Sequence, residues 1–266
     1  MISLEISAFF HDSSVALVVD GKVVAGALEE RFSRVKHDKE FPLRACQYCL
    51  KYAGISLSEV DIVVFYEKPF QKFERILKTH IQNAPRSLSM FLKSMPIWLK
   101  ERLNMRRTIR HKLEKEFGYF SASIRFVDHH LSHAATAFYS SEFEEAGILV
   151  IDAVGEESTT SIYKADALGI QLLQSQHFPN SLGLLYSACT YFLGFVVNSD
   201  EYKVMGLAPY GRIDVPETQH FLNIIKNQLV DIRDDGSIRL NEHYFSFMYT
   251  DRMVNDKQWE QLFGFP

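Results

Sequence analysis

The chain has 266 residues, of which 47% are hydrophobic and 23% are charged, and its formal net charge is −4. This length allows two lobes with separate cores, and the acidic balance argues against nucleic-acid binding, which usually requires a basic surface. The sequence has no apolar run of the roughly 18–20 residues that cross a bilayer, so we expect no membrane partner. It also has no secretory signal and only three cysteines, so we expect a cytoplasmic protein.

The N-terminal segment predicts three strands joined by two turns. The strands are expected at Ile2–Phe9, Val15–Val19 and Lys22–Leu28. The first turn, His11–Ser14, is polar, and the second, Asp20-Gly21, is a dipeptide that favours a two-residue hairpin. This order predicts a β-meander whose first turn carries hydroxyls and a carboxylate.

A helix and a buried strand follow this meander. Leu43–Ala53 has helical spacing, and we interpret its two cysteines, Cys46 and Cys49, as packing residues. Asp61–Tyr66 contains an unbroken apolar run and predicts a buried strand. Between about 69 and 120, apolar residues at helical spacing and dense Lys and Arg predict a helical insertion with a solvated basic face.

A second β-unit begins near Gly147. Strands are expected at Ile148–Ile151, Thr159–Tyr163 and Ile170–Ser175, followed by a helix over Leu182–Leu193. This layout repeats that of the N-terminal segment, including an acidic turn after the first strand. We therefore predict an α/β fold of two duplicated lobes, the first over residues 1–145 and the start of the second over 146–266.

The most informative motif is Asp128–Ala135, in which three histidines begin a predicted helix of about 129–140. His129 and His133 are four residues apart, so they project from one face of that helix. Such a pair is typical of sites that hold a divalent metal through neutral ring nitrogens. His130 lies on another face, where it can contact a substrate or cap the end of the preceding strand.

The two acidic turns are candidate nucleotide-binding loops. Small residues leave backbone N–H groups free to form an anion-binding nest, serine hydroxyls add donors, and aspartates can bind Mg²⁺. A pair of such loops in a duplicated unit resembles the phosphate loops of the actin, sugar-kinase and Hsp70 superfamily. The residues expected to bind the nucleotide are Asp12, Ser13, Ser14, Asp152, Gly155 and Glu156.

Four segments carry a resemblance to a known family. They are Ile6–Ser14 with Glu29–His37, Asp128–Ala135, Asp152–Glu156, and Asn180–Tyr186 running on to Glu201–Gly211. In their order and in their residues, these segments resemble the NodU/CmcH-type O-carbamoyltransferases over nearly the whole chain. The resemblance implies an actin-like (ASKHA, RNase H-like) fold, similar to that of the catalytic subunits that make tRNA threonylcarbamoyladenosine. The helical insertion then lies in the first lobe, and the second lobe is incomplete.

The resemblance also implies a two-step reaction. A C-terminal domain makes carbamoyl adenylate from carbamoyl phosphate and ATP with Mg²⁺, and the actin-like domain moves the carbamoyl group to the hydroxyl of a small-molecule acceptor. The family metal, usually treated as Fe²⁺, maps onto His129 and His133. His11 matches a family position implicated in transfer, as a general base or in positioning the adenylate. Lys203 can neutralise phosphate charge, or it can pack through its aliphatic stem.

The sequence departs from the family pattern in its second acidic turn and in its ending. Ala153 stands where glycine is usual, and Glu157 stands where an aromatic residue is common, so an extra carboxylate lies beside this loop. The chain stops at Phe263–Pro266, within a family segment. We expect the adenylate-forming domain, and the remaining lobe with a third, carboxylate metal ligand, to be supplied in cis or in trans.

Two other functions remain open. One is a phosphotransferase of the acetate-kinase or sugar-kinase type, against which the histidines argue because such kinases hold Mg²⁺ on carboxylates. The other is a catalytically inactive remnant that binds a nucleotide or a partner. The sequence does not specify the acceptor, and a homodimer is also open.

Overall fold

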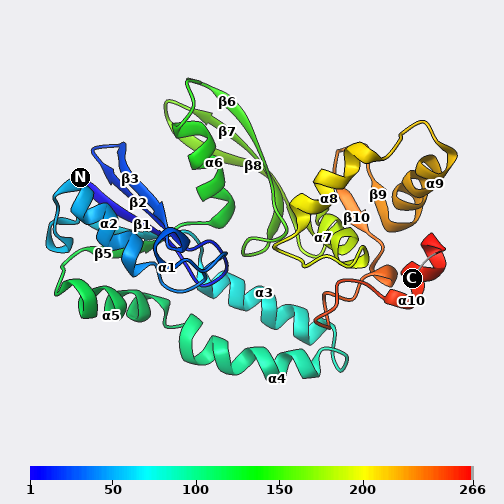
Figure 1. Cartoon of the computed structure of the whole chain (residues 1–266), viewed down its shortest axis with the longest axis horizontal. Coiled ribbons are helices and arrows are strands. Elements are labelled where there is room, and N and C mark those ends of the chain that lie inside the picture. The colour runs from blue at the N-terminus through cyan, green and yellow to red at the C-terminus, as the bar shows by residue number, and fades with distance from the viewer. Residues whose placement is uncertain (265–266) are drawn as a thin grey trace. The chain divides into compact units, whose positions relative to one another are not determined.

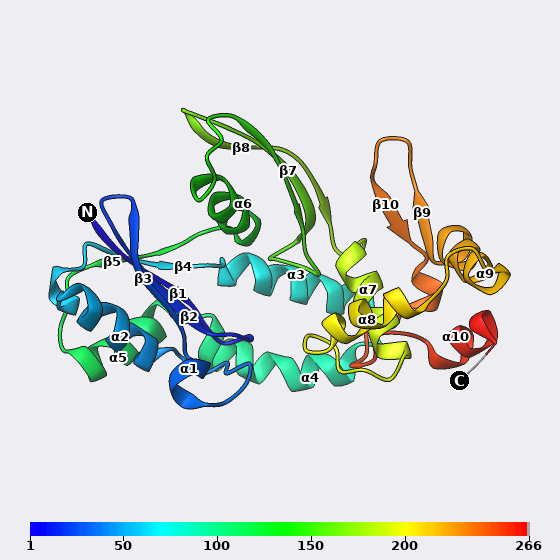
Figure 2. The same cartoon turned by 45° about the horizontal axis from the view of Figure 1, so that its top comes forward.

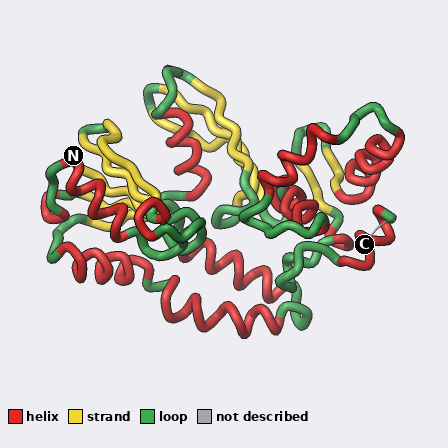
Figure 3. Tube along the Cα trace, in the orientation of Figure 1, coloured by secondary structure: helices red, strands yellow, loops and turns green. Residues whose placement is uncertain are grey.

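The structure, a computed structural model, describes residues 1–264, with the side chains of all of these except residues 100 and 101. It contains both helices and strands (Figures 1 and 3), so the fold class is mixed α/β, as predicted. The chain divides into two compact units. Unit 1 comprises Met1–Phe70 and Ile97–Ser132, and unit 2 comprises Gln71–Pro96 and His133–Pro266.

This division differs from the boundary that the sequence predicts after residue 145. The sequence assigns the whole insertion over 69–120 to the first lobe, but Gln71–Pro96 belongs to unit 2. Its side chains explain why, because Arg75 Nε donates to the carbonyl oxygen of Glu156 at 2.5 Å and Lys78 Nζ lies 3.6 Å from the Glu157 carboxylate. The insertion itself is helical, as predicted. It contains α3 (Pro69–Gln82), α4 (Leu88–Ile97), the π-helical turn η2 (Trp98–Arg102) and α5 (Met105–Phe117).

Unit 1 contains a five-stranded sheet in the order β3-β2-β1-β4-β5. Its antiparallel meander is followed by two strands that run parallel to β1 (Figure 2). Asp20 and Gly21 join β2 to β3 with φ values of 50° and 80°, the left-handed conformation that this two-residue turn requires, so the predicted hairpin is confirmed. The strands are β1 (Ile2–Ser7), β2 (Ser14–Val19), β3 (Lys22–Leu28), β4 (Ile62–Phe65) and β5 (Ser123–Phe126).

The core of unit 1 lies between this sheet and two helices, α2 (Leu43–Ala53) and α5. Leu4, Leu17 and Val63 are fully buried, and burial of such a side chain stabilises a fold by about 1.5–3 kcal/mol. Cys46 and Cys49 are both buried and free, and burial raises the pKa of each thiol, so the packing interpretation of this pair is confirmed. Two short helices complete the unit, α1 (Glu30–Ser33) and η1 (Leu57–Glu59).

Unit 2 has a three-stranded antiparallel sheet in the order β6-β7-β8. Its strands are β6 (Ala146–Ile151), β7 (Ser158–Asp166) and β8 (Gly169–His177). Each unit therefore contains an antiparallel meander of three strands, which is the arrangement that the sequence pattern predicts. The part of helix α6 (His129–Tyr139) that follows Ser132 lies beside this sheet (Figures 1 and 2).

A separate core in unit 2 surrounds Trp259, which is 1% exposed. Its indole Nε1 donates to the carbonyl oxygen of Tyr244 at 2.9 Å, which satisfies the buried ring nitrogen. Leu185, Leu240 and Phe245 pack in the same cluster. The elements of this region are α7 (Leu182–Phe192), α8 (Glu201–Leu207), η3 (Ala208–Tyr210), α9 (Pro216–Ile224), η4 (Ile225–Leu229), β9 (Val230–Ile232), β10 (Ile238–Leu240), η5 (Glu242–Tyr244) and α10 (Asp256–Phe263). Within residues 1–264, none of the helices combines the length and the apolarity that crossing a membrane would need.

Candidate functional site

The histidine motif forms the first turns of α6, as the sequence predicts. The Asp128 carboxylate accepts a hydrogen bond from the backbone N–H of Leu131 at 3.2 Å, which satisfies one of the free amides at the helix start. The ring of His129 meets Tyr66 edge to face, with ring centroids 5.4 Å apart. His129 and His133 are separated by one turn of this continuous helix, whereas His130 is only 1% exposed. The burial of His130 favours a packing role for its ring over contact with a substrate.

The Asp152 carboxylate lies near His133, the second histidine of this pair. Within unit 2, His133 and Asp152 offer ligand atoms that lie within 4.8 Å of each other. A metal ion bound at about 2.0–2.2 Å by an imidazole nitrogen and a carboxylate oxygen fits between groups at such a separation. The sequence assigns Asp152 to nucleotide binding and expects the carboxylate ligand of the metal beyond the end of the chain. The geometry instead makes Asp152 a candidate ligand of the same ion as His133.

The loop that carries Asp152 is held by the start of α7. Ser181 caps this helix by accepting from the Leu184 N–H at 3.0 Å, and its hydroxyl donates to the carbonyl oxygen of Ala153 at 2.7 Å. Gly183 lies so close to the loop that a Cβ there would be 2.6 Å from the Ala153 nitrogen. The glycine is therefore required for the close approach of helix and loop.

Three backbone amides of the same loop are already occupied. Asp152 N–H donates to the carbonyl oxygen of Thr159 and Gly155 N–H to that of Ser158, each at 2.9 Å, and Ala153 N–H donates to the side chain of Asp152 at 2.7 Å. These three donors therefore do not form the anion nest that the sequence predicts, because the loop closes as a hairpin between β6 and β7. Glu156 is 4% exposed, and burial removes its carboxylate from the surface of the loop.

The first acidic loop has a different arrangement, with its aspartate between two imidazoles. The Nδ1 of His11 lies 2.8 Å from one carboxylate oxygen of Asp12, and the Nδ1 of His37 lies 3.0 Å from the other. Partial burial raises the pKa of Asp12, but the hydrogen bonds from His37 and His11 outweigh this, so the net pKa is lowered. His37 ends the Glu29–His37 segment of the family resemblance, which predicts no role for it.

The two serines of the first loop have separate environments. Ser13 is 1% exposed, and its hydroxyl has no hydrogen-bond partner within residues 1–264. A buried hydroxyl without a partner is costly, which fits a group that a bound ligand would satisfy. Ser14 is the first residue of β2, paired with Ser7 and Leu28, so it belongs to the sheet and not to the loop.

Lys203 lies on α8 and already has an acidic partner. Its Nζ is 2.8 Å from the Asp200 carboxylate, and this hydrogen bond raises the pKa of the lysine. The amine is also 5.9 Å from the Tyr202 ring, within the range of a cation–π contact. Because Asp200 neutralises it, Lys203 is a weaker candidate for holding a phosphate than the sequence implies.

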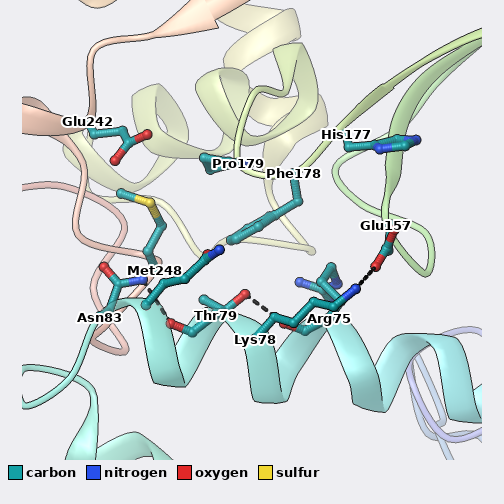
Figure 4. Close-up of a pocket in the computed structure, with 11 residues that line it drawn as sticks. Arg75, Lys78, Thr79, Asn83, Glu157, His177, Phe178, Pro179, Glu242 and Met248 are labelled. Carbon is teal, nitrogen blue, oxygen red and sulfur yellow. Dashed lines mark hydrogen bonds and ion pairs between the residues drawn. The ribbon is translucent and has the colours of Figure 1, made fainter.

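Unit 2 also contains an open pocket of about 430 Å³, shown in Figure 4. Arg75, Lys78 and Thr79 project from α3, and Asn83 from the turn just after it, toward the segments around Glu157 and 177–179. The guanidinium of Arg75 stacks over the Phe178 ring at 5.0 Å, and Lys78 Nζ forms ion pairs with Glu74 at 2.9 Å and Glu157 at 3.6 Å. The pocket therefore combines charged, hydrogen-bonding and apolar groups.

Comparison with known proteins identifies the family. The model of the carbamoyltransferase N-terminus matches residues 3–266 of this chain. The chain is 47% identical, over 99% of its length, to the uncharacterized protein sll1178 of Synechocystis sp., and 36% identical, over 88% of its length, to the nodulation protein NolNO of Sinorhizobium fredii. The chain belongs to the carbamoyltransferase family and corresponds to its N-terminal region.

The chain spans a minority of the length of these relatives, 42% of the Synechocystis protein and 32% of NolNO. Among solved structures, one described as having similarity to peptidase YeaZ, from Pseudomonas aeruginosa, aligns at 18% identity with a TM-score of 0.36. That alignment covers 65% of this chain and 64% of the other. A likeness at this level does not assign a fold.

Proposed function

We propose that this chain is the transferring part of an O-carbamoyltransferase, which moves a carbamoyl group from carbamoyl adenylate to an acceptor hydroxyl. Family membership supports the reaction class. The observation that carries the proposal is that His133 and Asp152 offer ligand atoms within 4.8 Å of each other, because a Lewis acid near the carbamoyl group lowers the barrier to its transfer. The acceptor is a hydroxylated small molecule.

The proposed metal ligands are His133 and Asp152, and also His129, which the i,i+4 spacing places one helical turn before His133. Two imidazoles and one carboxylate are a donor set that suits Fe²⁺ with open positions for substrate. When bound, such an ion supplies polarisation of the carbamoyl oxygen or of the phosphate, worth several kcal/mol of charge stabilisation. His133 is exposed and can therefore meet a ligand from solvent.

The proposed general base is His11. Its Nδ1 faces Asp12, so a proton on Nδ1 leaves Nε2 as the acceptor. In the transfer step, the acceptor oxygen attacks the carbamoyl carbon, Nε2 takes the hydroxyl proton, and the bond between carbon and the phosphate oxygen breaks as AMP leaves. A positioned base of this type contributes about 10²–10⁴ in rate.

We further propose that the two meanders belong to two actin-like lobes of one duplicated design, and that an adenylate-forming domain acts with this chain in cis or in trans. That domain would make the adenylate from carbamoyl phosphate and ATP with Mg²⁺. The buried free hydroxyl of Ser13 supports a ligand contact at the first loop. The occupied amides of the second loop argue against the phosphotransferase alternative, because that loop offers no free nest at Asp152, Ala153 or Gly155.

We assign acceptor binding to the pocket of Figure 4. Glu157 lines this pocket and follows the acidic loop directly in sequence, so the pocket and Asp152 are linked through a short, ordered stretch of unit 2. Its polar groups from α3 and its apolar side chains suit a small molecule with several hydrogen-bonding groups.

The test separates the two half-reactions. The chain is assayed with its adenylate-forming partner, with carbamoyl phosphate, ATP and a panel of hydroxylated acceptors. H11N is expected to lose transfer by about 10²-fold or more, while adenylate formation from ATP and carbamoyl phosphate stays at the wild-type rate. If H11N lost both half-reactions together, or neither, the role of His11 would be wrong. Transfer by the chain without its partner would contradict the proposed division of labour.

A further inference from the structure

Two loops of unit 1 are fastened together around Asp12. The backbone N–H of Phe9 donates to the carbonyl oxygen of Lys39 and that of Ser13 to the carbonyl oxygen of Asp38, each at 2.9 Å. These two bonds hold the segment after β1 against the segment that contains His37. The loop carrying His11 and Asp12 therefore has a defined backbone conformation.

His37 is held in place from its own side as well. Its backbone N–H donates to a carboxylate oxygen of Glu30 at 3.0 Å. Asp12 and His37 both adopt left-handed backbone conformations, with φ of 50° and 55°. Residues other than glycine adopt this conformation uncommonly, although Asp and His do so more often than most, and strained positions are enriched at functional sites.

The imidazoles of His37 and His11 contact different oxygens of the Asp12 carboxylate. His11 Nδ1 is 2.8 Å from Oδ2, and His37 Nδ1 is 3.0 Å from Oδ1. A carboxylate with one engaged oxygen can rotate about its terminal torsion, whereas one with both oxygens engaged by anchored donors cannot. The orientation of Asp12, and through it that of His11, therefore depends on His37.

We propose that His37 is a positioning residue for carbamoyl transfer: it fixes Asp12, which in turn holds His11 with Nε2 available to the acceptor hydroxyl. This inference rests on the proposed role of His11 as general base. His37 does not touch the acceptor in this scheme. Its effect is confined to the fraction of time that the His11 ring is correctly aligned.

A cation site is the competing interpretation of the same residues. Asp12, Glu30 and His37 offer ligand atoms within 4.8 Å of one another. Each of the two carboxylates, however, already accepts a hydrogen bond from His37, through the ring at Asp12 and through the backbone at Glu30. This arrangement favours a hydrogen-bonded support over a site for a metal ion, and the experiment distinguishes the two.

The test compares H37N, H37A and H37Q in the chain assayed with its adenylate-forming partner. In H37N the side-chain amide nitrogen reaches about as far as the imidazole Nδ1 and restores the bond to Asp12, whereas alanine has no donor and glutamine places its amide one bond further out. H37A and H37Q are expected to lose at least about tenfold in the kcat of transfer, a part of what a positioned base supplies. The KM for the acceptor and the adenylate-forming rate should stay unchanged, and H37N should recover most of the loss. H111A, at an exposed histidine of α5, is the matched control and should behave as wild type.

Four outcomes would overturn the inference. The first is wild-type transfer by H37A or H37Q, and the second is an equal loss in H37N and H37A. The third is a raised acceptor KM without a change in kcat, and the fourth is recovery of activity in H37A on adding Mg²⁺ or Mn²⁺, which would identify a cation ligand.

If H37A does not fold, the comparison of H37Q with H37N gives the same decision. H11N in the same assay separates the proposals: retained transfer there defeats the proposed function, whereas inactive H11N beside fully active H37A defeats only the role of His37.

Discussion

His133 and Asp152 present ligand atoms within 4.8 Å of each other although they come from different elements of unit 2, a helix and the turn after β6. His133 is placed by the register of α6, and Asp152 by the hairpin bond from its N–H to Thr159. The pairing thus depends on two locally rigid supports, which is the arrangement that a site of fixed geometry requires.

Loss of the metal is the first expected consequence of changing this group. The variant with both H129A and H133A should contain no bound iron after anaerobic purification, because it lacks both of the proposed imidazole ligands. D152N should weaken metal binding by more than the roughly tenfold that follows from losing an outer hydrogen-bond partner of a ligand. Elemental analysis and titration with Fe²⁺ or Co²⁺ measure both effects, and H111A serves as the control. Full metal occupancy in the double variant would rule out this site.

G183A is expected to disturb the same site through the loop that carries Asp152. The new Cβ would lie 2.6 Å from the Ala153 nitrogen and 2.7 Å from the Asp152 carbonyl carbon, so the loop or α7 must shift. Forced shifts of this kind cost about 1–3 kcal/mol. We therefore expect both the free energy of unfolding and the metal affinity to decrease in G183A. G206A is a matched control, because that glycine lies in α8 with no atom within 4 Å of its Cβ position. It should leave stability unchanged or raise it by up to ~1 kcal/mol. Urea unfolding of both variants checks the difference, and equal midpoints would show that the loop yields freely.

Local pattern was enough to predict the meanders, the Asp20-Gly21 hairpin and the histidine helix, because each depends on residues close in sequence. The partner of His133 was not predictable in this way. Asp152 reaches it through tertiary packing, and its sequence context equally suits a phosphate loop. The occupied amide of Gly155 was missed because glycine marks a flexible backbone without showing where its N–H points. His37 gave a weak signal, since nothing in its neighbours indicates the left-handed conformation that directs it to Asp12.

The stability contributed by Asp12 should depend on pH in a defined direction. Hydrogen bonds from His37 and His11 outweigh partial burial and lower the pKa of Asp12 in the folded state. A carboxyl whose folded pKa is lowered stabilises the fold above its unfolded pKa, about 3.9, and this contribution is lost as the pH falls through the folded value. Wild type should therefore be more stable than D12N between about pH 5 and pH 7, and the difference should shrink below about pH 4. Urea midpoints of both proteins across this range check the sign. A difference that grows on acidification would contradict the two hydrogen bonds.

Reversing a charge in the pocket of Figure 4 should affect the acceptor alone. Lys78 lines the pocket from α3 and is 56% exposed, so K78E changes the field there without removing a buried group. It also places a third carboxylate beside Glu74 and Glu157, which repel it and are left without their cation. We expect the KM for the acceptor to change several-fold, while adenylate formation and metal content stay at wild-type values. K22E, at the exposed start of β3, is the matched control for net charge. Steady-state kinetics over a range of acceptor concentrations make the comparison. An unchanged KM in K78E, or an equal change in K22E, would remove acceptor binding from this pocket.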